Sequence, residues 1–223
     1  MRVKFEEQLE KLNVMLIDMG ALCEEAIGYA VKALEEDSRE MCEKTMLTDE
    51  TIEERQREIE AACLKLLLQQ QPVASDLRLV SASIKMIGDM ERIGDQACDI
   101  AEIAKTLKND SDSFNREMIS SMAEAVTDMV KKSVDSYIRK DIKLANDVII
   151  KDDVVDNFFD SVRDELIKAV SVDSSCGEYF VDILMIAKYL ERIGDHAVNI
   201  SRWVIYSITG EHVGKEPIEE GTI

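Results

Sequence analysis

The sequence predicts an all-α protein: two tandem three-helix bundles related by an internal repeat, with an elongated shape. Three observations lead to this prediction. The 223 residues include only two prolines, nine glycines and 5% aromatic residues, a composition that favours long helices over sheets. Apolar residues recur at spacings of three and four along most of the chain, as on the buried face of a helix. A motif in the first half of the chain also returns in the second half.

The first half of the chain contains three predicted helices. Residues 5–34 carry apolar side chains at every third or fourth position, a pattern typical of a bundle helix. A second helix begins after the Asp-Ser pair at 37–38, which can cap it, and ends near the Gln-Pro pair at 71–72. The third helix begins at the Ser-Asp pair at 75–76 and ends at the polar linker 109–113.

The second half of the chain follows the same plan. Three further helices are expected at about 114–138, 141–171 and 178–209. The chain therefore divides into a first bundle, residues 1–110, and a second bundle, residues 111–210. Residues 211–223 contain glycine, proline and charge without periodicity, so we expect them to form a flexible tail.

Two pairs of segments carry the internal repeat. The sequence Asp-Met-Glu-Arg-Ile-Gly-Asp at 89–95 matches Tyr-Leu-Glu-Arg-Ile-Gly-Asp at 189–195. Further upstream, Leu-Thr-Asp-Glu-Thr-Ile-Glu at 47–53 matches Ile-Lys-Asp-Asp-Val-Val-Asp at 150–156. A repeat of this length indicates a duplicated three-helix unit, which predicts pseudo-twofold symmetry within one chain.

The charge excludes some classes of function. There are 27 basic and 46 acidic residues, which give a net charge of −19. Binding of nucleic acid requires clustered cationic side chains, so this class is not expected. The same charge argues against holding free phosphate by general electrostatics, unless a metal ion inverts the local field.

Cysteine usage and hydropathy predict a cytoplasmic protein. The five cysteines are an odd number without a C-x-x-C pair, as expected for reduced thiols. No apolar run approaches the roughly 18 residues that a membrane-spanning helix needs. The first residues are too charged for a signal peptide. We therefore expect no direct insertion into a membrane.

Acidic residues interrupt the apolar seams of four predicted helices. Four acids fall on a seam, and five others follow at one-turn steps: Asp49, Glu91, Asp152 and Glu191, then Glu53, Asp95, Asp99, Asp156 and Asp195. In an antiparallel hairpin, residues at equal height have a constant sum of residue numbers, set by the centre of the loop. With loop centres near residues 74 and 175.5, the predicted pairs are Glu53 with Asp95, Asp49 with Asp99, Asp156 with Asp195 and Asp152 with Asn199. Four acids of the other helices are expected near this height: Glu24, Glu25, Glu124 and Asp128.

Carboxylates that converge inside a bundle cannot all stay ionised without a counter-charge, because burial and mutual repulsion raise their pKa. They could be protonated, bound to cations, or paired with basic residues such as Arg92, Arg192, Lys85 or Lys188. The two arginines directly follow the glutamates and point about 100° around the helix, so we expect them to be poor partners. A solvated acidic face is the alternative, but two matched copies favour metal binding.

The ligand types predict which metal is bound. Oxygen ligands suit Mg²⁺, Mn²⁺, Ca²⁺ or iron. Zinc is less favoured, because structural zinc prefers cysteine and histidine. His196, beside Asp195, is a less favoured ligand, and core packing is the expected role of Cys23 and Cys98.

Three sequence motifs resemble those of the PhoU family of regulators of bacterial phosphate uptake and signalling. They are Gln-Gln-Pro-Val-Ala-Ser-Asp-Leu-Arg at 70–78, Glu-Arg-Ile-Gly-Asp at 91–95 and Glu-Arg-Ile-Gly-Asp-His at 191–196. The resemblance covers residues 5–209 and implies two tandem three-helix bundles, often with multinuclear metal clusters on the acidic motifs. Arg78, which Glu178 replaces in the second unit, is either a surface contact or part of an ion pair at the start of its helix.

The resemblance also implies a set of metal ligands. The family motif falls on Glu91, Asp95 and Asp99 in the first unit and on Glu191 and Asp195 in the second, where Asn199 replaces the last carboxylate. Four further ligands rest on the height argument together with the resemblance: Asp49, Glu53, Asp152 and Asp156.

By resemblance, the protein is a non-catalytic negative regulator that acts when phosphate is plentiful. It is expected to couple the phosphate ABC transporter, through its ATPase, to the phosphate-sensing histidine kinase. It would then lie peripherally at the inner membrane through protein partners, and we expect a homo-oligomer, a dimer. Two alternatives from other classes are a metal-dependent hydrolase that activates water on clustered carboxylates and a structural scaffold whose acids bind nothing.

Overall fold

The computed structural model describes residues 2–70, 72–107, 116–172 and 174–214. Six long α-helices and one short 3₁₀ helix make up this part of the chain. In chain order they are α1 (Arg2–Glu36), α2 (Arg39–Gln70), α3 (Ala74–Thr106), α4 (Glu117–Arg139), α5 (Ile142–Val172), η1 (Ser174–Cys176) and α6 (Gly177–Thr209). The described residues contain no β-strand, and the predicted all-α class is confirmed.

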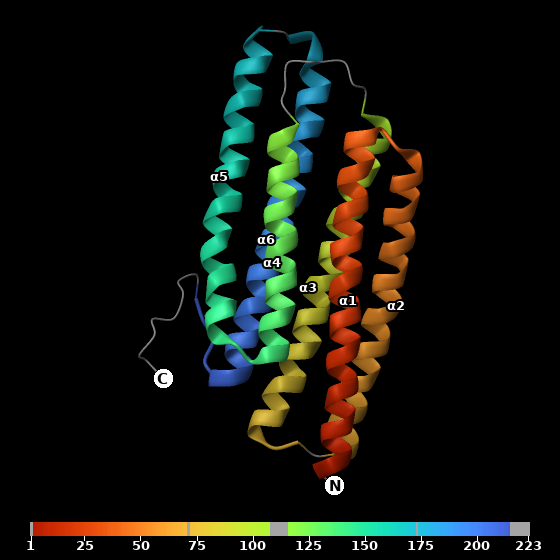
Figure 1. Cartoon of the computed structure of the whole chain (residues 1–223), viewed down its shortest axis with the longest axis vertical. Coiled ribbons are helices and arrows are strands. Elements are labelled where there is room, and N and C mark those ends of the chain that lie inside the picture. The colour runs from red at the N-terminus through yellow and green to blue at the C-terminus, as the bar shows by residue number, and fades with distance from the viewer. Residues whose placement is uncertain (1, 71, 108–115, 173, 215–223) are drawn as a thin grey trace.

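The helices form two antiparallel trios that lie side by side along the long axis (Figure 1). The first trio is α1–α3 and the second is α4–α6. The contact between α3 and α6 is the most extensive of any helix pair, so these two helices form the centre of the molecule. The α2–α3 connection lies at one end of the molecule and the α5–α6 connection at the other (Figure 1). The prediction of two elongated tandem bundles is confirmed.

The apolar seams form one continuous core. Leu12, Leu16 and Met19 of α1 are fully buried. Between the trios, a glycine allows close packing of α1 on α4: a Cβ atom added to Gly20 would lie 3.0 Å from Cγ2 of Val134. Burial of these side chains provides the main stabilisation, at about 25 cal/mol per Å² of apolar surface.

The first residues of the predicted flexible tail follow α6. Gly210 has a φ of 82° and ends the helix, with its amide donating to the Tyr206 carbonyl at 2.8 Å. The chain then folds back, so that the His212 ring stacks on Tyr206 at 4.2 Å between centroids and Val213 packs against the core. The flexibility of this tail stays a prediction. Residues 215–223, and the predicted linker 109–113, lie outside the described residues.

Arg78 lies where the start of α3 meets the end of α6. Its guanidinium carbon would be 3.5 Å from a Cβ atom on Gly210. Its Nε is buried and has no hydrogen-bond partner among the described residues. This arginine packs across the last turn of α6, where the negative end of the helix dipole favours a positive charge.

Candidate metal centre

The predicted acids of the first trio face one another across α2 and α3. Asp49 of α2 packs directly against Gly94 of α3, and a Cβ atom at Gly94 would overlap Oδ1 of Asp49. This close approach is possible only because position 94 has no side chain. Oδ1 of Asp49 is buried and has no hydrogen-bond partner among the described residues. A buried carboxylate oxygen without a partner is the kind of group that a bound cation satisfies.

Electrostatic coupling defines which acids belong to this first cluster. Burial is the main cause that raises the pKa of Asp49 to about 6; a hydrogen bond from the Cys98 thiol opposes the rise, and repulsion from Asp95, Glu53 and Glu91 adds to it. The pKa of Glu91 is raised by burial first and then by Asp95. These acids are close enough for each charge to destabilise the others.

The second cluster repeats the arrangement on α5 and α6. Oδ1 of Asp152 would lie 3.4 Å from a Cβ atom on Gly194. Burial is the main cause that raises the pKa of Asp152 to about 6, followed by repulsion from Asp156 and Asp195. Burial also raises the pKa of Asp156, and Glu191 is the next cause. Both hairpins therefore bring their acids together independently.

The predicted pairing within each hairpin is wrong by about one helical turn. Asp49 lies beside Gly94 rather than level with Asp99, and Asp152 lies beside Gly194 rather than level with Asn199. Asp99 is placed one turn farther along α3, where burial and then Glu102 and Asp95 raise its pKa while Arg192 of α6 lowers it. Asp99 therefore lies at the edge of the first cluster.

Asn199 faces the interface between the trios. Its amide nitrogen donates to Asp89 of α3 at 3.3 Å, and its amide oxygen accepts from Arg202 at 3.3 Å. His196 lies beside it, with Nδ1 2.9 Å from the same carboxylate of Asp89. Both side chains are thus engaged at the α3–α6 contact.

More basic side chains interact with the acidic clusters than the sequence predicted. Nη1 of Arg92 lies 2.8 Å from Asp95, and its Nε lies 3.5 Å from Glu91, although the arginine side chain is 60% exposed. The expectation that Arg92 is a poor partner is therefore wrong, because its long side chain bends back along the helix surface. In the second cluster Lys188 forms an ion pair with Glu191. Arg202 also lowers the pKa of Asp152.

Cys98 differs from its expected role in the core. Its thiol is partly exposed, and it donates a hydrogen bond to the Asp49 carboxylate. Val198 occupies the matching position of the second unit. Cys23 is fully buried, as expected, and its thiol donates to the Met90 carbonyl at 3.4 Å. Burial raises the pKa of both thiols, so neither is a reactive thiolate.

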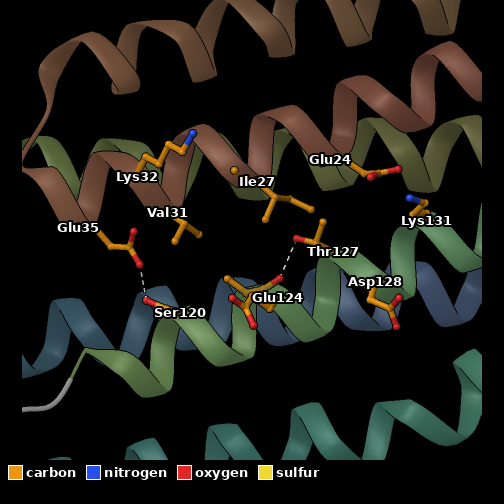
Figure 2. Close-up of a pocket in the computed structure, with 12 residues that line it drawn as sticks. Glu24, Ile27, Val31, Lys32, Glu35, Ser120, Glu124, Thr127, Asp128 and Lys131 are labelled. Carbon is orange, nitrogen blue, oxygen red and sulfur yellow. Dashed lines mark hydrogen bonds between the residues drawn. The ribbon is translucent and has the colours of Figure 1, made fainter.

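The acids predicted on α1 and α4 line a groove between these helices rather than the clusters (Figure 2). The groove has a volume of about 480 Å³ and includes Glu24, Glu124 and Asp128 among its lining residues. At one end of it, Ser120 donates to Glu35 at 2.5 Å (Figure 2). Burial raises the pKa of Glu24, whereas Lys132 and Lys151 lower that of Asp128 despite its burial. Glu25 is exposed to solvent.

The side chains of the clusters are not gathered around a single point. Within the described ranges, no group of three or more His, Cys, Asp or Glu side chains is placed to hold a metal ion. The residues nevertheless suit a hard cation, because they are oxygen donors in mutual repulsion and include the unpartnered Oδ1 of Asp49.

Substitution of the two glycines tests the close approach of the acids. Alanine exceeds glycine in helix propensity by about 1 kcal/mol, so Gly194→Ala, which meets only ordinary contacts, is expected to stabilise the protein. Gly94→Ala is expected to be less stable than Gly194→Ala by about 1–3 kcal/mol, because its Cβ overlaps Asp49. Thermal unfolding of both variants gives the comparison. Equal stabilisation by the two alanines would contradict the packing of Asp49 on Gly94.

No helix in the described part of the chain is both long and apolar enough to span a membrane.

Comparison with known proteins identifies close relatives over nearly the whole chain. The chain matches the PhoU domain over residues 16–104 and again over residues 119–204. A phosphate-specific transport system accessory protein PhoU homolog of Clostridium acetobutylicum is 37% identical, covering 94% of this chain and 96% of that protein. The homolog of Aquifex aeolicus is 35% identical, covering 98% of this chain and 99% of that protein.

Solved structures agree with this match. The crystal structure of PhoU from Pseudomonas aeruginosa has a TM-score of 0.87 and 33% identity, covering 93% of this chain and all of that chain. The phosphate transport system regulatory protein PhoU from Streptococcus pneumoniae also has a TM-score of 0.87, with 28% identity and coverage of 94% and 99%. The two matched segments fall within the trios α1–α3 and α4–α6. The chain therefore belongs to the PhoU family.

Proposed function

We propose that this protein is a metal-binding, non-catalytic negative regulator of phosphate uptake and of phosphate-starvation signalling. The observation that carries the metal part of the proposal is the unpartnered Oδ1 of Asp49, buried against Gly94 among carboxylates that raise the pKa of Asp49. The regulatory part is supported by family membership.

The ligands in this proposal come from both hairpins. Asp49, Glu53, Glu91 and Asp95 would hold metal in the first cluster, with Asp99 at its edge. Asp152, Asp156, Glu191 and Asp195 would do so in the second. A bound cation would neutralise acids that otherwise repel one another, and oxygen donors favour iron, manganese, magnesium or calcium over zinc. The metal would thus stabilise the hairpins and set the charge of the surface that they present.

Membership of this family also confirms the prediction of a protein that is not an enzyme, because the relatives are named accessory proteins of phosphate-specific transport. The hydrolase alternative is accordingly set aside. By analogy with those names, this protein would act together with a phosphate transport system.

The proposed partners are the ATPase of the phosphate ABC transporter and the phosphate-sensing histidine kinase. The protein would work in the cytoplasm, as a dimer, at the inner face of the membrane. With a net charge of −19, it would be repelled by anionic lipid. Attachment through proteins is therefore favoured over attachment to the bilayer itself.

Deletion of the gene tests the regulatory role. In rich phosphate, the deletion strain is expected to keep phosphate-starvation genes switched on, and the wild-type gene should restore repression. Co-purification of the tagged protein with the transporter ATPase or the kinase tests the partners. Normal repression in the deletion strain would contradict the regulatory role, and tight binding to bare anionic vesicles would contradict attachment through proteins.

A further inference from the structure

A small pocket lies on α6 where the chain folds back after Gly210. It has a volume of about 130 Å³ and is lined by Asn199, Arg202, Trp203, His212 and Val213. None of these five lining residues is acidic, although the protein has 46 acidic residues. The lining of the pocket itself therefore carries no negative charge, although Asp89 accepts a hydrogen bond from Asn199.

Arg202 provides unused hydrogen-bond donors at this pocket. A guanidinium has five N–H donors. Nη1 donates to the Asn199 amide oxygen at 3.3 Å. Nε is buried and has no hydrogen-bond partner among the described residues. A buried donor without an acceptor is unfavourable, so this position calls for an acceptor.

Aromatic contacts hold the other side of the pocket. The His212 ring stacks on Tyr206 with 4.2 Å between centroids and meets Trp203 edge-on at 5.6 Å. Trp203 and Tyr206 are also in edge contact at 5.9 Å. Ring packing thus places His212 beside Arg202 in the wall of the pocket.

We propose that this pocket binds a small tetrahedral oxyanion of the class of inorganic phosphate, with Arg202 as its principal ligand. A guanidinium pairs with oxyanions through charge-assisted N–H bonds, and Arg202 lines the pocket. The volume of 130 Å³ leaves room for a free phosphate or sulfate ion.

The net charge of the protein does not prevent this binding. Most of the acidic residues are solvent-exposed, and interactions between exposed charges are screened beyond about 8 Å at physiological ionic strength. Asp89 and Asp152 lie closer, beside Asn199 and Arg202, and oppose anion binding. The donors of the pocket act at contact distance. We expect a weak affinity, in the millimolar range, which matches a pocket with one arginine.

The pocket is connected to the second acidic cluster through Arg202. The positive charge of this arginine acts on Asp152 as well as on the pocket. An oxyanion bound to Arg202 would compete with Asp152 for that charge, so occupancy of the pocket would change the field at the second cluster. Binding at the two places is then linked in both directions. The inference goes beyond the proposed function and does not depend on bound metal.

The sole tryptophan of the chain, Trp203, gives a local signal for the test. Full-length protein is treated with chelator, and its tryptophan fluorescence is followed during titration with inorganic phosphate at constant ionic strength, with sodium chloride as the reference. A saturable change is expected for phosphate and for sulfate. Glycerol phosphate, which carries an esterified group, should bind more weakly than free phosphate because of the pocket size.

Two substitutions test whether Arg202 is the residue that binds phosphate. Arg202→Gln is expected to weaken phosphate binding at least about tenfold, since a hydrogen bond to a charged group contributes about 1.5–3 kcal/mol. Arg163→Gln removes the same charge from an exposed position of α5, where the arginine pairs with Asp160 and Asp164. This control should bind phosphate like the wild type. Circular dichroism verifies that both variants are folded.

Absence of a saturable response to phosphate would overturn the proposal, as would equal affinity in wild type and Arg202→Gln. Equal weakening by Arg163→Gln would assign the effect to general electrostatics and would also overturn it. If Arg202→Gln does not fold, His212→Gln, which lies outside the helices, replaces it. Weaker phosphate binding by His212→Gln supports the pocket, and unchanged binding rejects it. The measurement uses metal-free protein, so its failure is distinguishable from a failure of the metal proposal.

Discussion

The double substitution Glu91→Gln and Asp95→Asn is expected to abolish the tighter of the two metal sites. It removes two of the charges that surround Asp49 while preserving the shape of both side chains. Affinity of oxygen sites for divalent cations depends on the number of charged ligands. A loss of at least about 100-fold in affinity is therefore expected. Isothermal titration calorimetry of chelator-treated protein with Mn²⁺ measures this loss of affinity.

The first cluster is expected to bind more tightly because of the residues around it. The second cluster has its own cations: Lys188 pairs with Glu191, and Arg202 acts on Asp152. At the matching positions the first unit has Gly88 and Glu102. Arg92 does pair with Asp95, but its side chain is 60% exposed, and Arg192 acts on Asp99 at the edge of the first cluster. The charges that act on Asp49 are acidic, whereas Arg202 lowers the pKa of Asp152.

The matched control is the double substitution Glu191→Gln and Asp195→Asn. This variant should keep the tighter site and lose only the weaker one. The fold should survive in both variants, because the buried apolar seams provide the stability. Equal loss of Mn²⁺ binding in the two variants would contradict the asymmetry. Full binding in the Glu91/Asp95 variant would show that these residues are not the ligands.

The stability of the metal-free protein should fall as pH rises through the range in which Asp49 and Asp152 ionise. Both carboxyls have a folded-state pKa of about 6, above the ordinary value of 3.8. The folded state therefore binds more protons than the unfolded state between these values, so ionisation opposes folding. The penalty is absent below pH 3.8, grows up to about pH 6 and is constant above it.

The double variant Asp49→Asn and Asp152→Asn measures this penalty. At pH 7.5 it should be more stable than wild type by about 2 kcal/mol in total, a value reduced from the full shifts because both side chains are partly exposed. The difference should shrink at pH 5. Urea unfolding of chelator-treated protein at both pH values gives the free energies. A variant that is no more stable than wild type at pH 7.5 would contradict the repulsion within the clusters.

Much of the fold could be predicted from the sequence because hydrophobic periodicity records which face of each helix is buried. The acids of the hairpins could also be predicted, because position on a seam determines orientation. Their pairing could not, since it depends on the exact length of the loop. Helix α2 ends at Gln70 and α3 begins at Ala74, so the turn is centred about two residues before the expected position. That shift moves the partners in the first hairpin by about one turn. In the second hairpin α5 ends at Val172 and α6 begins at Gly177, so the turn is centred only about one residue before the expected position and explains part of the shift.

Among the contacts made by polar side chains, those within one helix could be predicted from the sequence, and those between the trios could not. The ion pair of Lys188 with Glu191 follows the i, i+3 spacing and was open to prediction. The bonds of Asp89 to His196 and Asn199 cross between the two trios, and no local pattern indicates them. The packing of His212 on Tyr206 likewise depends on the chain reversal at Gly210.

Equilibrium dialysis with elemental analysis tests most directly whether the acidic clusters bind metal. Chelator-treated wild-type protein is dialysed against defined concentrations of Mn²⁺ or Fe²⁺, and the metal on each side of the membrane is measured by mass spectrometry. The structure predicts saturable binding of at least one ion per chain, and replacement of Glu91 and Asp95 by glutamine and asparagine should remove the more tightly bound metal and leave only the weaker binding of the second cluster. Equal metal concentrations on the two sides, at every concentration tested, would contradict it.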